Sequence, residues 1–326
     1  MPKQYAIGVD VGGTKILAAV VDVHAGQVVS SARKRTRPDK GSDFFVDRLL
    51  SLVQSAIDDA KLPDPDQLSG IGVGIAGQVD RANGVLLASP NLGVGFENLP
   101  LAKLLSDRFH QPVAISNDVD VATIGEQHYG AARGVDDFVC VFVGTGIGSG
   151  IVQGGSAYRG ATGTAGEIGH TIVQYGGRIC GCGGRGHLEA YASRSAITRV
   201  LQAELLRGRK SLLSELPSPD DPGIRSKIIA RCLDAGDPLV TEVVTEAADY
   251  LGAGLGSLIT FYNPRRVILG GGLIEATQLL FDRASARARE AALPIPGRQV
   301  EIVRTELGDN SGVIGAARLG SFFAAD

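Results

Sequence analysis

Four side chains able to bind a metal ion occur close together in the middle of the sequence: His170, Cys180, Cys182 and His187. Thiolate sulfur and imidazole nitrogen are ligands that zinc accepts in tetrahedral sites. Glycines between them supply the tight turns that a chelating loop needs. Because protein ligands would fill all four positions, we expect a structural zinc rather than a catalytic one. The alternative is a glycine-rich loop that contains thiols by chance.

Two acidic residues, Glu167 and Glu189, stand just outside this group of ligands. A folded metal loop would hold both carboxylates in fixed positions. The sequence therefore predicts a metal site bordered by acids.

Two glycine-rich turns follow apolar segments in the two halves of the chain. The residues in these turns are Gly12, Gly13 and Thr14 in the first half, and Gly144, Thr145 and Gly146 in the second. Each turn lies between two predicted strands, 5–9 and 16–23 in the first half and 138–143 and 147–152 in the second. Backbone N–H groups and a threonine hydroxyl in each turn can hold phosphate, so the pair predicts nucleotide binding. Neither turn is a P-loop, because neither has the lysine spacing or leads straight into a helix.

A third glycine run, Gly270, Gly271 and Gly272, follows a predicted strand at 266–269. It would suit the adenine and ribose end of a nucleotide, because glycine lets the backbone approach a planar base. An ordinary strand-to-helix connection, with the helix beginning after Ala276, is the other interpretation.

The segment Gly72–Gly77 satisfies the spacing of the dinucleotide-binding fingerprint. That fingerprint must open a helix, whereas residues 78–84 predict a turn that returns into a strand at 85–87. We therefore reject a nicotinamide-dependent oxidoreductase.

The length of 326 residues and the 44% hydrophobic content allow a large core and favour two α/β domains over one. Helical periodicity predicts helices at 43–60, capped by Ser42 or Asp43, and at 241–262 and 311–322. Residues 210–223 are the best candidate for an exposed or mobile connection.

The formal charge of −3 disfavours a nucleic-acid surface, so we expect a small-molecule substrate and no nucleic-acid partner. The sequence has no signal-peptide pattern and no apolar run long enough to cross a bilayer, which predicts a cytoplasmic protein without a membrane partner. Cys140 and Cys232 fall in apolar segments and do not suggest a disulfide framework.

Several motifs occur in the order found in the ROK family of sugar kinases and repressors, which the whole chain resembles. They are Asp10-Val-Gly-Gly-Thr-Lys15, Ser116-Asn-Asp118, Gly144-Thr-Gly-Ile-Gly148, Gly166-Glu-Ile-Gly-His170, the Cys-Gly-Cys cluster and Leu188-Glu-Ala-Tyr-Ala-Ser193. The resemblance implies an actin-like, RNase H-like ATPase fold, with two lobes and a cleft in which ATP meets a hexose. We expect residues 1–117 plus 306–326 in the small lobe and 118–305 in the large one. The repressor branch is not expected, because only nine residues precede the first phosphate turn.

The resemblance also implies the roles of individual residues. Asp118 would be the catalytic base that takes a proton from the 6-hydroxyl of the hexose; a helix cap at Asn117 or Asp118 is the structural alternative. The hexose would be held by Gly77, Asn91, Asn117, Asp118, Glu167, His170 and Glu189. Asp10 and Lys15 would join the glycine turns in binding ATP, with Asp10 orienting the water shell of Mg²⁺. His170 could bind both zinc and sugar.

The sequence departs from the family pattern at His187, where a third cysteine is usual. Imidazole can still bind zinc, but it leaves the site with two thiolates instead of three. The expected reaction is the conversion of glucose to glucose 6-phosphate. A kinase for N-acetylmannosamine, N-acetylglucosamine or another hexose, polyphosphate as donor, and a sugar-sensing regulator without turnover remain open. The resemblance favours a homodimer or homotetramer.

Overall fold

The computed structural model describes residues 4–62, 64–89, 91–215 and 224–322, and the chain divides into two compact units. Unit 1 comprises residues 1–134 and 309–326, and unit 2 comprises residues 135–308. The boundary expected at residue 117 is therefore corrected to residue 134. Helix α3 (Asp118–Tyr129), which was expected in the large lobe, packs against α11 (Ser311–Ser321) in unit 1.

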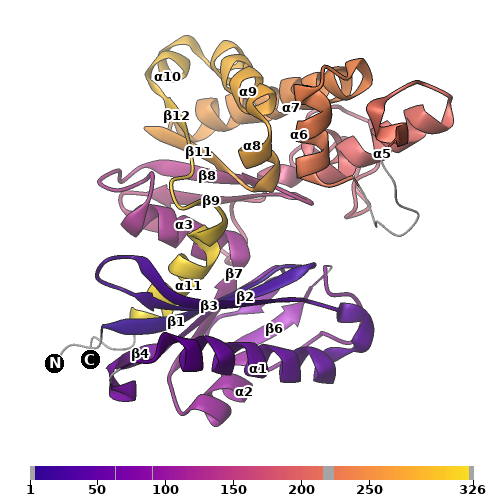
Figure 1. The fold of residues 1–326 in the computed structure, drawn as a ribbon. Helices are drawn as coiled ribbons and strands as arrows, with labels where there is room; N and C mark the ends of the chain where they lie inside the picture. Colours follow the sequence, from indigo (N-terminus) through magenta and orange to yellow (C-terminus); the bar gives the residue numbers. More distant parts are fainter. Residues whose placement is uncertain (1–3, 63, 90, 216–223, 323–326) are drawn as a thin grey trace. The chain divides into compact units, whose positions relative to one another are not determined.

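Unit 1 contains a five-stranded sheet with strand order β3-β2-β1-β4-β7 (Figure 1). Its strands are β1 (Tyr5–Val11), β2 (Lys15–Asp22), β3 (Gln27–Arg35), β4 (Leu68–Ile75) and β7 (Val113–Asn117). The first three pair in antiparallel fashion, which confirms that the first glycine turn lies between two strands, and β4 and β7 add in parallel. Asp10 therefore lies near the end of β1, and Asp118 directly follows β7.

Helices cover both faces of this sheet. They are α1 (Ser42–Ala60), α2 (Leu101–Phe109), α3 and α11. The apolar side of α1, including Phe45 and Leu49, is buried in one core with Ile7 and Val9 of β1. On the other face, α11 packs against β1 and β4.

The approach of α11 to the sheet depends on glycine. A Cβ atom at Gly72 of β4 would lie 1.7 Å from the carbonyl oxygen of Ala316. One at Gly8 of β1 would lie 1.9 Å from the carbonyl oxygen of Val313. Only residues without a side chain allow this helix backbone to lie against the strands.

The segment that matches the dinucleotide fingerprint forms part of this packing and opens no helix. Strand β4 ends at Ile75, and the chain continues into a small antiparallel pair, β5 (Gln78–Asp80) and β6 (Val85–Ala88). This topology agrees with the rejection of the nicotinamide interpretation.

Unit 2 repeats the topology of unit 1, with strand order β10-β9-β8-β11-β12. Its strands are β8 (Phe138–Val143), β9 (Ile147–Gln153), β10 (Ser156–Tyr158), β11 (Arg266–Gly270) and β12 (Glu301–Arg304). The order and the directions of pairing match those of unit 1 strand for strand. The second glycine turn therefore lies between two strands, as predicted, and has the same place in its sheet as the first.

The helices of unit 2 surround a second, separate core. They are α4 (Glu189–Ala192), α5 (Arg194–Leu206), α6 (Ser226–Asp234), α7 (Pro238–Tyr262), α8 (Gly272–Ala276), α9 (Gln278–Ala291) and α10 (Pro294–Gln299). Helices α7 and α9 form the most extensive helix pair, and Cys140 and Cys232 are both buried, as their apolar surroundings in the sequence indicated.

Some local predictions require correction. Helix α1 begins at Ser42 with Gly41 in the cap position, and no side chain makes a cap hydrogen bond there. A helix starts directly at Gly272, earlier than the predicted start after Ala276. Of the predicted connection 210–223, residues 216–223 lie outside the described residues, while the hydroxyl of Ser211 donates a 2.6 Å hydrogen bond to Asp237.

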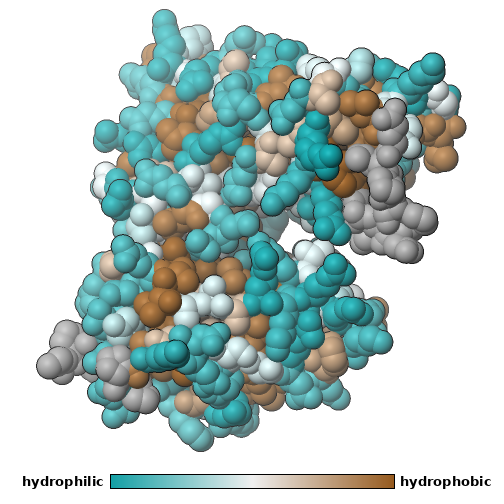
Figure 2. Space-filling model, viewed as in Figure 1, coloured by the Kyte–Doolittle hydropathy of each residue, from teal (hydrophilic) through white to brown (hydrophobic). Residues whose placement is uncertain are grey.

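Within the described residues, no helix has both the length and the apolar character needed to cross a membrane. On the face that Figure 2 shows, hydrophilic residues predominate in each unit, with apolar residues between them.

Candidate active site

Unit 1 brings together three residues predicted to act on a sugar. Asp118 is the first residue of α3, and Asn117 caps the helix by accepting a 2.8 Å hydrogen bond at Oδ1 from the backbone N–H of Val119. The Nδ2 atom of Asn117 donates to the carbonyl oxygen of Gly77 at 3.2 Å. Asn117 therefore caps helix α3. The helix-cap role, which was the structural alternative to catalysis for Asp118, is filled by its neighbour.

Asp118 has a carboxyl group with an unusual proton affinity. Burial raises its pKa to about 7, and the negative charge of Asp10 adds to the shift. One Oδ1 contact with the backbone N–H of Val119, at 3.1 Å, opposes the shift only in part. A carboxyl group with a pKa close to neutral pH is suited to general base catalysis.

Asp10 is a second carboxyl group with a raised pKa, about 6, again mainly because of burial. The positive charge of Lys15 lowers this pKa, and the negative charge of Asp309 raises it. The carboxylate lies against the first turn of α11, where a Cβ atom at Gly312 would be 2.9 Å from its Cγ atom. A helix start favours negative charge, and carboxylate oxygen suits the hydrated Mg²⁺ that the resemblance implies.

The first glycine turn is held in shape by the strands beside it. The backbone N–H of Gly12 donates to the carbonyl oxygen of Lys15 at 2.9 Å, and the hydroxyl of Thr36 donates to the carbonyl oxygen of Gly12 at 2.7 Å. Asn91 lies against this turn, since a Cβ atom at Gly13 would be 3.2 Å from the Asn91 Cβ atom. Unit 1 thus places a predicted sugar residue beside a predicted phosphate turn.

In unit 2 the four predicted zinc ligands are brought together. One ligand atom from each of His170, Cys180, Cys182 and His187 can be chosen so that all four lie within 4.8 Å of one another. The Nδ1 atom of His187 is 3.2 Å from Sγ of Cys182, and Nδ1 of His170 is 3.8 Å from Sγ of Cys180. These separations match the edges of a tetrahedron with metal–ligand distances of about 2.0–2.3 Å, so the donor set fits a zinc ion.

Glu189 connects this cluster with the second glycine turn. Its Oε2 atom accepts a 2.9 Å hydrogen bond from the backbone N–H of Ile147, and Sγ of Cys180 lies 3.7 Å from Oε1. A Cβ atom at Gly146 would come within 2.4 Å of Oε2, so a larger residue there would displace this carboxylate. One predicted sugar ligand is therefore positioned by both the metal loop and the phosphate turn.

The second and third glycine turns of unit 2 lie side by side. Gly271 has a φ of 91°, and a Cβ atom there would be 2.6 Å from the carbonyl oxygen of Val143, the residue before Gly144. Strands β8 and β11 are parallel neighbours, so both turns are at the same edge of the sheet. That edge is the place where nucleotides bind in open α/β sheets.

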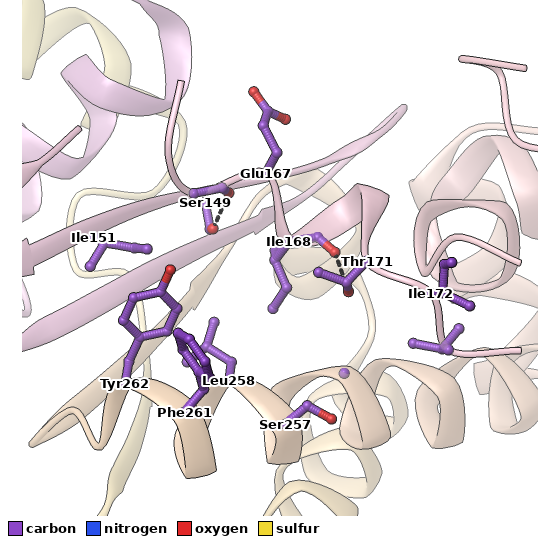
Figure 3. A pocket seen from close by; sticks show the side chains of 13 residues that line it. Ser149, Ile151, Glu167, Ile168, Thr171, Ile172, Ser257, Leu258, Phe261 and Tyr262 are labelled. Atoms are coloured by element: carbon purple, nitrogen blue, oxygen red, sulfur yellow. Dashed lines mark hydrogen bonds between the residues drawn. The ribbon is translucent and has the colours of Figure 1, made fainter. Parts of the chain in front are cut away.

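A cavity of about 400 Å³ in unit 2 lies behind the segment that carries Glu167 and His170. Its walls are mostly apolar and include Ile168 and, from α7, Leu258 and Phe261 (Figure 3). The carboxylate of Glu167 is exposed and points away from this space (Figure 3). Among the described residues, no side chain predicted to bind sugar, phosphate or metal therefore points into this cavity.

Two charged residues at these turns, Asp309 and Arg194, were not predicted from the sequence. Lys15 makes a 3.5 Å ion pair with Asp309, which lies some 290 positions later in the chain. Arg194 donates a 2.6 Å hydrogen bond from Nη2 to the hydroxyl of Thr145. Arg194 directly follows the Leu188–Ser193 motif, and a basic residue next to this family motif was the signal that could have indicated it.

Two sheets of the same topology, each with a glycine hairpin between its first two antiparallel strands, define an actin-like ATPase fold. Residues 6–321 match the model of the ROK family, and the chain belongs to that family. It is 32% identical over 320 residues to a glucokinase of Thermotoga maritima, with 98% of each chain covered.

Solved structures support the same relationship. A ROK family glucokinase from Streptomyces griseus, crystallised with glucose and AMPPNP, has a TM-score of 0.84 and 34% identity and covers 97% of this chain and 99% of its own. A xylose repressor of Caldicellulosiruptor bescii is also similar, at 28% identity over 81% of this chain and 65% of its own length. The full-length similarity to glucokinases supports a sugar kinase that uses ATP.

Proposed function

We propose that the protein phosphorylates the 6-hydroxyl group of glucose with ATP and releases glucose 6-phosphate and ADP. The observation that carries the proposal is the carboxyl group of Asp118, whose pKa is raised to about 7 at the start of α3. The similarity of the whole chain to glucokinases supports glucose as the acceptor.

In the proposed reaction, Asp118 accepts the proton of the 6-hydroxyl group. The hydroxyl oxygen forms a bond to the γ-phosphorus of ATP while the bond from that phosphorus to the β,γ-bridging oxygen breaks. Little further covalent chemistry is needed, because phosphoryl transfer depends mainly on position and electrostatic stabilisation. A carboxyl group of pKa near 7 is ionised in a large part of the molecules at neutral pH and still has appreciable proton affinity.

Mg²⁺ would neutralise charge on the phosphates of ATP, and Asp10 is the residue proposed to orient its water shell. The three glycine turns would supply N–H donors to the nucleotide, and Lys15 would add a positive charge. Hydrogen bonds from the neighbouring strands hold the first turn in shape, so its donors would need little reorganisation when phosphate binds.

The hexose is proposed to bind through Asn91, Asn117, Glu167, His170, Glu189 and the backbone of Gly77. Carboxylates and amides can each bond two neighbouring hydroxyl groups of a sugar ring. A bound sugar would cover these polar groups, so a sugar that lacks one hydroxyl would bind less well, because the protein group opposite the missing hydroxyl would have no partner. Glu189 supports this role most clearly, since both of its oxygen atoms are already oriented by neighbours.

A structural zinc ion at His170, Cys180, Cys182 and His187 is part of the proposal. Zinc would fix the loop that carries both His170 and Glu189, so it would act on the reaction through sugar placement. We also propose a cytoplasmic homo-oligomer, as the family resemblance implies; light scattering of the purified protein measures the number of chains.

The experiment that tests the proposed function is a coupled-enzyme assay over glucose, mannose, fructose, N-acetylglucosamine and N-acetylmannosamine, each with ATP and with polyphosphate. We expect the highest kcat/KM for glucose with ATP, and phosphorus NMR of the product should place the phosphate on the 6-oxygen. An acetamido sugar that is preferred by about tenfold, a difference of 1.4 kcal/mol in transition-state binding, would replace the substrate and leave the kinase proposal intact.

The similarity to a xylose repressor favours one alternative, a sugar-sensing regulator without turnover. A regulator has no use for a base at the 6-hydroxyl group, so Asp118 argues against it. Sugar binding without phosphorylation in the presence of ATP, measured by calorimetry alongside the coupled assay, would support the regulator.

A further inference from the structure

Arg194 is attached to the second glycine turn at two points. Its Nη2 atom donates to the Thr145 hydroxyl at 2.6 Å, and its backbone N–H donates to the carbonyl oxygen of Gly144 at 2.9 Å. It is the first residue of α5, whose start is fixed by Ser193 through a 3.1 Å hydrogen bond from the backbone N–H of Ala196. The guanidinium group is therefore held beside the turn rather than free to move through solvent.

This guanidinium group has no carboxylate partner among the described residues. Three other arginines of unit 2, Arg209, Arg266 and Arg283, all form ion pairs with acids. The charge that acts on Arg194 is instead the positive charge of Arg225, which lowers the pKa of Arg194 together with the larger effect of burial. A half-buried cation without a counter-charge is costly, and a bound anion would remove that cost.

The hydrogen bond to Thr145 also orients the hydroxyl. A threonine hydroxyl has one proton to donate and two lone pairs to accept. Because its oxygen accepts from Arg194, its own proton remains available to another acceptor. The backbone N–H groups of the turn add further donors, so the local chemistry is that of an anion site.

The surroundings indicate an anion that reaches from this turn toward the third glycine turn. Ser226, the residue after Arg225, has its Oγ atom 3.9 Å from the position of a Cβ atom at Gly272. The hydroxyl of Thr198, on α5, donates to the carbonyl oxygen of Ile224 at 3.3 Å. Arg194 thus lies beside the second turn, and residue 225 is next in the chain to Ser226, which lies near the third turn; this arrangement suits a chain of linked phosphates.

We propose that Arg194 is a phosphate-binding residue for the phosphoryl donor, acting together with the hydroxyl of Thr145. A guanidinium group can donate two parallel hydrogen bonds to a phosphate, which lysine cannot do. The inference rests on the proposed function in so far as the donor is ATP. The shared chemistry of ATP and polyphosphate is a phosphate chain, and the experiment separates the two.

The test is direct binding of a fluorescent ATP analogue, mant-ATP, to the purified full-length protein and to the variants Arg194→Gln, Arg194→Lys and Arg199→Gln. Arg199 is the matched control, because it lies on the same helix, is exposed and, within the part of the chain that the structure describes, bonds only to the carbonyl oxygen of Ser195 at 3.3 Å. Arg194→Gln should weaken mant-ATP binding by about tenfold or more, the size expected for a lost charge-assisted contact, and Arg194→Lys should weaken it less. Arg199→Gln should leave it unchanged.

Competition experiments identify which part of the ligand is bound. The inhibition constant of adenosine, measured by its displacement of mant-ATP, should be the same in Arg194→Gln as in the unmodified protein if the variant loses only phosphate contacts. Tripolyphosphate should compete with mant-ATP on the unmodified protein and lose that ability in Arg194→Gln; competition at concentrations well below those of ATP would identify polyphosphate as the preferred donor. Equal mant-ATP affinities of unmodified protein and Arg194→Gln, both folded by circular dichroism, would overturn the proposal. If Arg194→Gln does not fold, an unchanged affinity in Arg194→Lys would do so.

The binding experiment needs no turnover, so the two proposals fail independently. Arg194-dependent binding of mant-ATP in a protein that phosphorylates no sugar would refute the kinase and leave the phosphate site. Phosphorylation of glucose with an ATP KM that Arg194→Gln does not change would refute the phosphate site and leave the kinase.

Discussion

The negative charge of Asp10 acts on Asp118 and helps to raise the pKa of that carboxyl group to about 7. The two residues end up in one unit through different strands, since Asp10 is on β1 and Asp118 follows β7. Burial alone would already disfavour two carboxylates, and their mutual repulsion adds to the cost. Carboxyl groups kept where their ionisation costs free energy are typical of functional sites.

Replacement of Asp118 by asparagine tests its role most directly. As the general base, its loss should lower kcat by about a hundred- to ten-thousandfold in a folded protein. The stability of this variant should increase rather than fall. Because the pKa of Asp118 is raised in the folded state, the folded protein binds more protons than the unfolded chain between about pH 4 and 7. The free energy of unfolding therefore decreases as pH rises over this range, and the carboxyl group has its full destabilising effect above about pH 7. Asp118→Asn should therefore be more stable than the unmodified protein at pH 8 by up to about 4 kcal/mol.

Chemical denaturation at pH 5 and pH 8 measures this effect beside the coupled assay. Asparagine at 118 with near-normal turnover would contradict the catalytic role. A variant that is less stable at pH 8 would show that the charged form of Asp118 makes contacts that the fold needs.

The pH dependence of kcat/KM provides a second test. Activity should rise as pH increases through about 7, because Asp118 must lose its proton before it can act as a base. Asp10→Asn removes one negative charge that raises this pKa, so the acidic limb of the remaining activity should move to lower pH. Asp309→Asn is the control, because the charge of Asp309 acts on the pKa of Asp10 and is not among the causes that shift the pKa of Asp118. A limb that stays in place in Asp10→Asn would exclude the coupling.

Local sequence patterns were sufficient to predict the two glycine hairpins and most of helix α7. Each depends on neighbours in the chain: a glycine turn between alternating apolar residues, or apolar residues at helical spacing. The cluster of two histidines and two cysteines could also be predicted from the sequence, because its members lie close together in the chain and their side chains are distinctive metal ligands.

Long-range packing explains what was not predicted. Helix α3 belongs to unit 1 because Gly125 and Gly315 allow it to contact α11, where a Cβ atom at Gly315 would be 1.6 Å from the carbonyl oxygen of Val121. Two isolated glycines almost two hundred positions apart carry no local sign of that contact. Arg194 was not predicted for a related reason, because Thr145, whose hydroxyl accepts its hydrogen bond, is far away in the sequence.

The metal cluster leads to a third prediction. Purified protein should contain about one zinc ion per chain, and His187→Ala should lose most of it because one of four ligands is removed. His187→Cys should retain zinc, since thiolate is an equally competent ligand. His24→Ala, which removes an exposed histidine outside the cluster, is the control. Elemental analysis measures the metal, and thermal unfolding with and without a chelator measures its contribution to stability.

Zinc loss should also affect sugar binding, because Cys180 lies 3.7 Å from a carboxylate oxygen of Glu189. We expect His187→Ala to raise the KM for glucose more than the KM for ATP. An unmodified protein with far less than one zinc per chain would contradict a structural metal site.

The close contact between β4 and α11 gives the last prediction, which concerns stability alone. A methyl group at residue 72 would lie 1.7 Å from the carbonyl oxygen of Ala316, and neither backbone can move without disturbing the core of unit 1. Gly72→Ala should therefore lower the free energy of unfolding by about 3 kcal/mol or more. Gly93→Ala is the matched control, because Gly93 has a φ of 86° but open space around it, so the methyl group costs only the left-handed strain of about 1–2 kcal/mol. Urea denaturation of both variants measures the difference; equal losses in the two would mean that α11 can shift away from the sheet at little cost, and that its glycine contacts do not determine how unit 1 packs.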